Sequence, residues 1–326
     1  MIVKNREKPL IIFQLEALLR RLPDEHPKKS EIHKELLKRK AGYRGEQSVD
    51  YYLSLLDEEK YDVYQDVRIF KNKNVFQIDT LLVTDYFLMI LEIKNISGTI
   101  HFDSLFNQLI RTIDGKEEGF KNPLSQLTYQ KNMLSDWLLD HKFPLFPFET
   151  AVVISNPSTI IKTMNGQSSA YQRIFHASNL ADKLKRLDQI YKNPLISPAG
   201  RKKLKKLLLK NHTPAKSDLL NRFQISKTEL VTGIACSNCH TYYMEHIYGK
   251  WKCGNCLYES KDAHLEAIDD YFLLISPFIT NREFRWFTNL FSPTKASRML
   301  SALNLTSKGY KKTSSHHQIS QPSAPF

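Results

Sequence analysis

Apolar residues recur at helical spacing in two stretches near the start of the chain. The first covers residues 10–22, and the second covers residues 31–57, where Val49, Leu53 and Leu56 form an apolar stripe. Gly42 and Gly45 fall inside the second stretch, and glycine is unfavourable in a helix interior. The pattern therefore predicts two helical segments, with a break or a helix start at the two glycines.

Three segments rich in Val, Ile, Tyr and Phe follow, separated by short polar turns. They read YDVYQDVRIF, VFQIDTLLVT and YFLMILEIKN and start at residues 61, 75 and 86. β-Branched and aromatic residues favour strands, and short connections favour antiparallel neighbours. This pattern predicts a β-meander.

Helical and strand patterns then alternate. The sequence NPLSQLTYQKNMLSDWLLDH predicts a helix that begins near Pro123, and FETAVVISNP predicts a strand. RIFHASNLADKLKRLDQIY predicts a strand and then a helix capped at Ser178 or Asn179. Together with the meander these elements describe an α/β domain that closes near residues 210–218, where polar linker composition begins.

Composition and charge narrow the class of partner. The 326 residues carry a formal net charge of +13, which favours nucleic acid or an anionic membrane surface. No segment approaches the ~18 apolar residues of a membrane span. The N-terminus mixes charges and a proline into its apolar patch, unlike an export signal. We therefore expect a cytoplasmic protein whose partner is nucleic acid and not a membrane.

Asp79, Glu92 and Lys94 interrupt the apolar run of the second and third strands. Burying an unpaired charge is costly, so these residues need partners or a metal. If Asp85 and Tyr86 are the central residues of a two-residue hairpin turn, the register places Asp79 opposite Glu92. Two like charges at facing positions destabilise a sheet unless a cation lies between them.

A divalent metal suits this arrangement. Hard oxygen ligands favour Mg²⁺ or Mn²⁺, which take protein carboxylates together with a substrate phosphate. Lys94 projects to the same side as Glu92, where it would hold or deprotonate an attacking water, or offset charge on the phosphorus. The three residues suit phosphodiester hydrolysis, and a solvated Glu-Lys pair on a strand edge is the alternative interpretation.

Asp79 followed by Glu92-x-Lys94 on the adjoining strand resembles the PD-(D/E)xK nuclease fold. YRGEQSVDYYL, VFQIDTLLVT, LEIKNISGTI and NPLSQLTYQKNML are similar to signature segments of its nuclease-related domain (NERD) family and cover roughly residues 41–157. The residue before Asp79 is Ile78, where the pattern PD-(D/E)xK has proline. The resemblance implies a restriction-endonuclease-like mixed sheet flanked by helices. It assigns five residues to the active site or its support: Glu46, Asp79, Glu92, Lys94 and Gln126.

The cysteines follow the pattern C-x2-C-x13-C-x2-C, formed by Cys236, Cys239, Cys253 and Cys256. Each C-x2-C pair can place two thiolates about 2.3 Å from one Zn²⁺, and the intervening segment is long enough for a short hairpin. The arrangement resembles a zinc ribbon with structural zinc. Redox-active dithiols and unrelated free thiols are the alternatives.

Aromatic and basic residues crowd the same segment: Tyr242, Tyr243, Tyr248, Lys250, Trp251 and Lys252. They suit stacking on bases and contacts with phosphates. A small zinc module must also use its aromatics for packing, which we favour for Trp251 and Tyr243.

Two further basic stretches have two interpretations each. RKKLKKLLLK at residues 201–210 has a leucine stripe, which favours a solvated lysine face over a DNA contact. SPTKASRMLSALNL, which follows TNREFRWFTNLF, resembles the second helix of a helix-turn-helix with Lys295, Ser297 and Arg298 exposed. A local helix pair is the alternative.

These segments predict an order of domains along the chain. They are an N-terminal helical segment at 1–40, a nuclease core at 41–157, its α/β continuation at 158–212, a zinc ribbon at 213–260, a helix-turn-helix-like helical module at 261–312 and a disordered tail at 313–326. We expect a nuclease dependent on Mg²⁺ or Mn²⁺ that acts in DNA processing, with DNA favoured over RNA. An inactive nucleic-acid-binding or scaffold protein on the same fold is the alternative, and the oligomeric state stays open.

Overall fold

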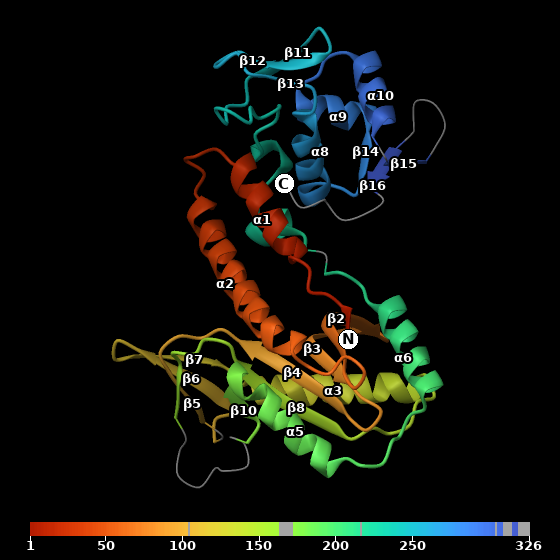
Figure 1. Ribbon diagram of the computed structural model, residues 1–326. Coiled ribbons are helices and arrows are strands. Elements are labelled where there is room, and N and C mark those ends of the chain that lie inside the picture. Colours follow the sequence, from red (N-terminus) through yellow and green to blue (C-terminus); the bar gives the residue numbers. More distant parts are fainter. Residues whose placement is uncertain (104, 163–171, 216, 304, 309–314, 319–326) are drawn as a thin grey trace. The chain divides into compact units, whose positions relative to one another are not determined.

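The computed structural model describes residues 1–103, 105–162, 172–215, 217–303, 305–308 and 315–318. The chain divides into two compact units, whose elements are labelled in Figure 1 where there is room. The first unit combines Met1–Pro9 with Arg39–Ala215, and the second combines Leu10–Lys38 with Lys216–Phe326. Each unit is therefore built from two separate stretches of sequence.

The first unit contains a mixed six-stranded sheet in the order β1-β2-β3-β4-β8-β10. Consecutive strands β2, β3 and β4 are antiparallel, which confirms the predicted meander. The β3–β4 pairs run from Val83 opposite Leu88 to Thr80 opposite Leu91, which is the predicted register. β1, β8 and β10 each lie parallel to their neighbours. The strands are β1 (Ile2–Lys4), β2 (Asp62–Lys71), β3 (Asn74–Val83), β4 (Leu88–Lys94), β8 (Phe148–Ile154) and β10 (Ile174–His176).

Helices cover both faces of this sheet. Ile90 and Leu91 are neighbours on β4 and belong to two different apolar clusters, because side chains alternate along a strand. α3 and α6 pack on the face of Ile90, and α2 and α5 pack on the face of Leu91. The predicted mixed sheet flanked by helices is confirmed. The helices are α2 (Lys29–Ser54), α3 (Pro123–Asp140), α5 (Leu180–Ile190) and α6 (Pro198–Asn211).

Helix α2 continues through Gly42 and Gly45, so the predicted break is wrong. A Cβ atom on Gly45 would lie 2.3 Å from the Cβ of Asn95 and 2.9 Å from the Oγ of Ser155. Asn95 and Ser155 directly follow β4 and β8. Gly45 therefore allows α2 to approach the ends of these strands more closely than a residue with a side chain would.

A second sheet, in the order β7-β6-β5-β9, was not predicted. β7 reads KEEGFK and is almost wholly exposed, so it has no alternating apolar pattern. The available signal was Asp114-Gly115, because this pair favours the two-residue hairpin turn with positive φ at both positions, and their φ angles are 50° and 74°. The strands are β5 (Thr99–Asp103), β6 (Gln108–Ile113), β7 (Lys116–Lys121) and β9 (Ile160–Lys162).

The second unit is mainly helical and carries two small sheets. The helices predicted at residues 10–22 and on both sides of FSPT are confirmed as α1, α9 and α10. Nε of Arg21 lies 2.8 Å from Oδ2 of Asp270, and this buried ion pair joins α1 to α8. The helices are α1 (Leu10–Arg21), α7 (Leu219–Phe223), α8 (His264–Leu274), α9 (Asn281–Thr288) and α10 (Pro293–Ala302). The strands are β11 (Met244–Ile247), β12 (Lys250–Cys253), β13 (Glu259–Ser260), β14 (Phe278–Thr280), β15 (Leu305–Lys308) and β16 (Ser315–Gln318).

The structure describes one strand within the tail for which the sequence predicts disorder. Strand β16 lies within it and pairs with β14 and β15 on its two sides. Backbone hydrogen bonds to two neighbours can hold a polar segment that has no apolar pattern of its own. Residues 313, 314 and 319–326 of the tail lie outside the described residues. Among the helices that the structure describes, none is both long and apolar enough to cross a membrane.

Candidate active site

Strands β3 and β4 diverge where the sheet carries its acidic residues. Their regular pairing ends at Thr80 opposite Leu91, so Asp79 and Glu92 occupy the next positions. Beyond this point β3 stays paired with β2, and β4 stays paired with β8. Oδ2 of Asp79 accepts a hydrogen bond of 2.9 Å from the backbone N–H of Ile93, so this carboxylate bridges the two diverging strands.

Glu92 is 2% exposed and is held by donors from β4 and α3. Nζ of Lys94 lies 2.6 Å from its Oε1 atom. The Nε2 atoms of Gln126 and Gln130 donate to its Oε2 atom at 2.7 and 2.9 Å. Each carboxylate oxygen of Glu92 therefore has at least one donor, and the side chain has a fixed orientation.

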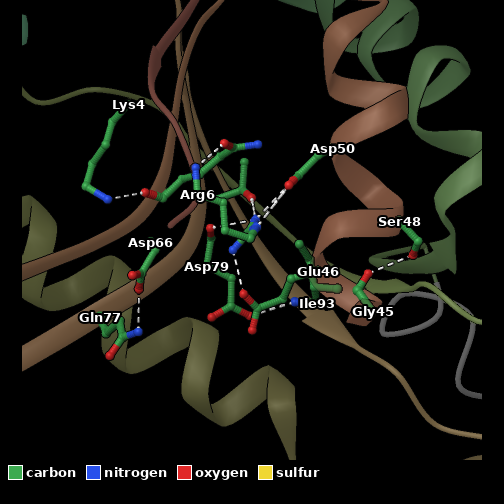
Figure 2. A network of polar contacts seen from close by, with 12 residues as sticks. Lys4, Arg6, Gly45, Glu46, Ser48, Asp50, Asp66, Gln77, Asp79 and Ile93 are labelled. Atoms are coloured by element: carbon green, nitrogen blue, oxygen red, sulfur yellow. Dashed lines mark hydrogen bonds and ion pairs between the residues drawn. The ribbon is translucent and has the colours of Figure 1, made fainter. Parts of the chain in front are cut away.

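Glu46 enters the site from α2. The preceding residue is Gly45, which brings the helix against Asn95. Nδ2 of Asn95 donates to the carbonyl oxygen of Ala41 at 2.7 Å and so fastens α2 to the end of β4. Figure 2 shows Glu46 beside Asp79. Nη1 of Arg6 lies 2.6 Å from Oε2 of Glu46.

The charges in the site shift the pKa values of three groups. Burial, followed by the charges of Glu92 and Glu46, raises the pKa of Asp79 well above its usual range. Burial raises the pKa of Glu46 to about 6, although the charge of Arg6 lowers it. Burial alone would lower the pKa of Lys94, but the negative charges of Glu92 and Asp79 together raise it by more, so the net shift is upward. A divalent cation beside these carboxylates would favour their ionised forms.

The donor set fits a hard cation. The carboxylates of Glu92 and Glu46 lie near enough to Asp79 for their charges to raise its pKa, and Mg²⁺ and Mn²⁺ prefer carboxylate oxygens as ligands. Oε1 of Gln130 is buried and makes no hydrogen bond within the described residues, so a further oxygen acceptor lies next to Glu92.

The structure brings the five predicted residues into one network and adds three that were not predicted. Gln130 follows Gln126 by about one helical turn, so the i, i+4 spacing on the predicted helix was the available signal. Arg6 and Asp50 had no such signal. They lie 44 positions apart in sequence, and although Asp50 belongs to the segment YRGEQSVDYYL, nothing in the sequence pairs it with Arg6.

The four cysteines of the second unit form a separate cluster. Their Sγ atoms all lie within 4.8 Å of one another, with 3.6 Å between Cys236 and Cys256 and 3.5 Å between Cys239 and Cys253. All four are free thiols. Four sulfurs about 2.3 Å from one Zn²⁺ would form a tetrahedron with edges of about 3.8 Å. The cluster therefore fits a tetrahedral metal such as Zn²⁺, as the predicted ribbon requires.

The aromatic residues of this module divide into buried and exposed ones. Trp251 is 1% exposed, and its Nε1 atom donates to Nδ1 of His264 at 3.2 Å, which confirms its packing role. Tyr243 is 70% exposed, so the packing predicted for it is wrong. Trp251 and residues of α8 and α9 fill that core instead. Tyr248 is 98% exposed in the turn between β11 and β12.

The structure places the two further basic stretches on helices α6 and α10. Leu204 and Leu208 of α6 are buried, which confirms the apolar stripe. Lys295 and Arg298 of α10 are exposed, as predicted. Whether α9 and α10 act as a helix-turn-helix stays a prediction.

Comparison with protein families supports the resemblance found in the sequence. Residues 41–155 match the family described as nuclease-related domain, NERD. This segment contains α2 from Ala41 onward, the strands β2 to β7, helix α3 and β8, and hence the five predicted site residues. The segment has a nuclease-related fold.

Two individual proteins are also similar to the chain. An uncharacterized protein of Bacillus anthracis is 25% identical over 136 residues, which is 41% of this chain and 62% of that protein. The chain therefore spans less than two thirds of that relative. The crystal structure of protein VC1899 from Vibrio cholerae aligns over 57% of this chain and 58% of its own, with 12% identity and a TM-score of 0.25.

Proposed function

We propose that this chain is a metal-dependent nuclease that hydrolyses phosphodiester bonds of nucleic acid. The observation that carries the proposal is the placement of Asp79 and Glu92 where β3 and β4 diverge, with Lys94 beside Glu92. The match of residues 41–155 to the nuclease-related domain family supports it. The restriction-endonuclease-like fold favours DNA over RNA as the substrate and DNA processing as the role.

Five side chains of the site have a role in the reaction under this proposal: Asp79, Glu92, Lys94, Gln126 and Gln130. Asp79 and Glu92 would hold Mg²⁺ or Mn²⁺, and Gln126 and Gln130 keep Glu92 oriented. When bound, the cation polarises a phosphate oxygen and lowers the pKa of a coordinated water. Lys94 orients the attacking water and offsets the negative charge that develops on the phosphorus. The water loses a proton to solvent and its oxygen bonds to phosphorus, the bond to the leaving sugar oxygen breaks, and that oxygen takes up a proton from solvent.

The second unit serves nucleic-acid binding in this proposal. Zn²⁺ in the cysteine cluster is structural, because four thiolates leave no open coordination position. The exposed Tyr243 and Tyr248 lie in a segment that also carries Lys250 and Lys252, a combination that suits stacking on bases and contacts with phosphates. Free thiols suit a reducing compartment such as the cytoplasm.

A catalytically inactive nucleic-acid-binding or scaffold protein is the second candidate. The ion pair of Arg6 with Glu46 favours it, because this carboxylate has a cationic partner without a metal. Asp79 has no comparable ion pair among the contacts of the described residues, and this carboxylate favours the enzyme.

A panel of substrates separates the two candidates. Supercoiled plasmid, linear duplex DNA, single-stranded DNA and RNA are incubated with the full chain and Mg²⁺ or Mn²⁺. We expect cleavage of at least one DNA substrate that stops when EDTA is added. Binding without cleavage on all four substrates, with both metals, would favour the scaffold.

A further inference from the structure

The N-terminal segment Met1–Pro9 belongs to the first unit although it precedes the segment that matches the nuclease-related family. Strand β1 adds to the edge of the sheet parallel to β2. Nζ of Lys4 donates to the carbonyl oxygen of Gln65 at 2.8 Å, and the backbone N–H of Arg6 donates to Oε1 of Gln65 at 2.7 Å. The hydrogen bond of its own N–H to Gln65 fixes the position from which the side chain of Arg6 projects.

All three guanidinium nitrogens of Arg6 have partners in the candidate site, as Figure 2 shows. Nη1 donates to Oε2 of Glu46 at 2.6 Å. Nε lies 3.2 Å from Oδ2 of Asp50, one helical turn further along α2. Nη2 donates to the carbonyl oxygen of Asp79 at 3.3 Å and to Oγ1 of Thr80 at 3.2 Å. One side chain therefore joins two carboxylates of α2 to the point where β3 leaves β4.

The chemistry of this contact is specific for arginine. The guanidinium is planar, stays charged and offers five donors in a fixed fork, whereas a lysine ammonium is a single point charge. The side chain of Arg6 is 2% exposed, so it cannot reach a substrate. Arg6 contacts Oε2 of Glu46 and not Oε1. The negative charge of Glu46 raises the pKa of Asp79.

We propose that Arg6 is a positioning residue of the nuclease site, which holds Glu46 beside Asp79 through its Nη1 contact. The functional nuclease unit therefore includes residues 1–9 and begins before the segment that matches the family. This inference rests on the proposed function, and it adds a residue from outside the matched segment.

A double-mutant cycle tests whether Arg6 acts through Glu46. Arg6→Gln should lower kcat on the order of ten- to a hundredfold, as loss of a partner that orients a metal-binding group does, with the KM for nucleic acid little changed. In a Glu46→Gln background Arg6→Gln should lower kcat little further, because the carboxylate that Arg6 holds is already replaced. Arg6→Lys should recover only part of kcat. Lys4→Met, which removes another contact of the same segment, should keep the activity of the wild type.

Mn²⁺ binding, followed by electron paramagnetic resonance, gives a second readout that needs no turnover. Arg6→Gln should bind Mn²⁺ more weakly than the wild type, and Arg6→Gln/Glu46→Gln should bind it like Glu46→Gln alone. If the wild type cleaves no substrate, the proposed function fails, and the Mn²⁺ cycle still decides the role of Arg6. Losses that add fully in the double variant would overturn the proposal and assign Arg6 to general stability. Unchanged or tighter Mn²⁺ binding by Arg6→Gln would overturn it too.

Discussion

Nζ of Lys94 lies 2.6 Å from Oε1 of Glu92, two positions earlier on β4. The other oxygen of Glu92 accepts hydrogen bonds from Gln126 and Gln130 on α3. The carboxylate and the ammonium are therefore fixed relative to each other by a strand and a helix. Fixed ligands suit metal-assisted hydrolysis, because a site that must rearrange during the reaction loses rate.

The two glycines of α2 provide a matched pair of variants. Gly45→Ala places a Cβ atom 2.3 Å from the Cβ of Asn95, so α2 must move and Glu46 must move with it. We expect a loss of about 1–3 kcal/mol in the free energy of unfolding, as for overpacking in a core, together with lower activity. Gly42 has no atom within 4 Å of an added Cβ, so Gly42→Ala should stabilise the helix by about 0.5–1 kcal/mol. Urea unfolding of both variants checks this, and equal effects would contradict the close approach at Gly45.

The pH dependence of stability tests the electrostatics of Asp79. Burial, Glu92 and Glu46 raise its pKa in the folded protein, so the protonated form favours folding. This stabilisation is complete below the unfolded pKa of about 3.9 and is lost as the pH rises through the raised folded pKa. Metal-free Asp79→Asn should therefore have a higher Tm than the wild type near neutral pH, and the difference should shrink in acid.

Thermal unfolding at several pH values, with and without Mg²⁺, measures this effect. Mg²⁺ should raise the Tm of the wild type and leave that of Asp79→Asn almost unchanged. Asp182→Asn, which changes an exposed carboxylate on α5, is the control and should follow the wild type. A wild type and an Asp79→Asn variant with the same Tm at every pH would contradict an ionisation penalty at Asp79.

The sequence predicted most of the site because its residues lie in strongly patterned elements. The hairpin register placed Asp79 and Glu92 at adjoining positions, and the helix after Pro123 was recognised from its apolar spacing. Gln130 was not predicted, because the family resemblance implies Gln126 alone and the i, i+4 spacing on the helix does not by itself mark a site residue. Arg6 was not predicted for a different reason. Its partners are 40 and more residues away, and one arginine in a charged segment carries no local pattern.

The elements that were mispredicted depend on tertiary contacts. Gly45 suggested a helix break, but its lack of a side chain serves the approach to Asn95. β7 and β16 are polar strands held by pairing with their neighbours, so they lack the apolar alternation that marks a strand in sequence. The exposed position of Tyr243 depends on which aromatic ring fills the small core of the zinc module, and Trp251 does so.

The cysteine cluster should contain one metal per chain. We expect elemental analysis to find about one Zn²⁺ in the wild type and almost none in Cys236→Ser/Cys253→Ser, because the remaining two thiolates cannot complete the tetrahedron. Removal of Zn²⁺ by a chelator should destabilise the β11–β12 hairpin and increase amide exchange there. A protein that is fully folded, free of metal and reactive at four thiols would contradict a structural zinc site.

The salt dependence of binding tests whether the second unit contacts nucleic acid. Deleting residues 213–326 would leave Arg21 without Asp270, so point variants are the cleaner choice. Lys295→Ala/Arg298→Ala on α10 should weaken DNA binding and flatten the slope of log K against log salt by about 0.9 for each phosphate that is no longer neutralised. Lys185→Ala/Arg186→Ala on α5 removes two exposed charges from the first unit as a comparison. An unchanged slope in the α10 variant would assign α10 to another partner.

The rate of DNA cleavage by Asp79→Asn and Lys94→Met, compared with Asp182→Asn, tests the central claim most directly. The three proteins are assayed with Mg²⁺ at equal concentration, and their folding is checked by circular dichroism. Loss of a group that holds the metal or stabilises the transition state should lower the rate on the order of a hundredfold or more, while Asp182→Asn should cleave like the wild type. Cleavage by folded Asp79→Asn and Lys94→Met at the rate of the control would show that the carboxylate and the lysine at the divergence of β3 and β4 are not the catalytic groups.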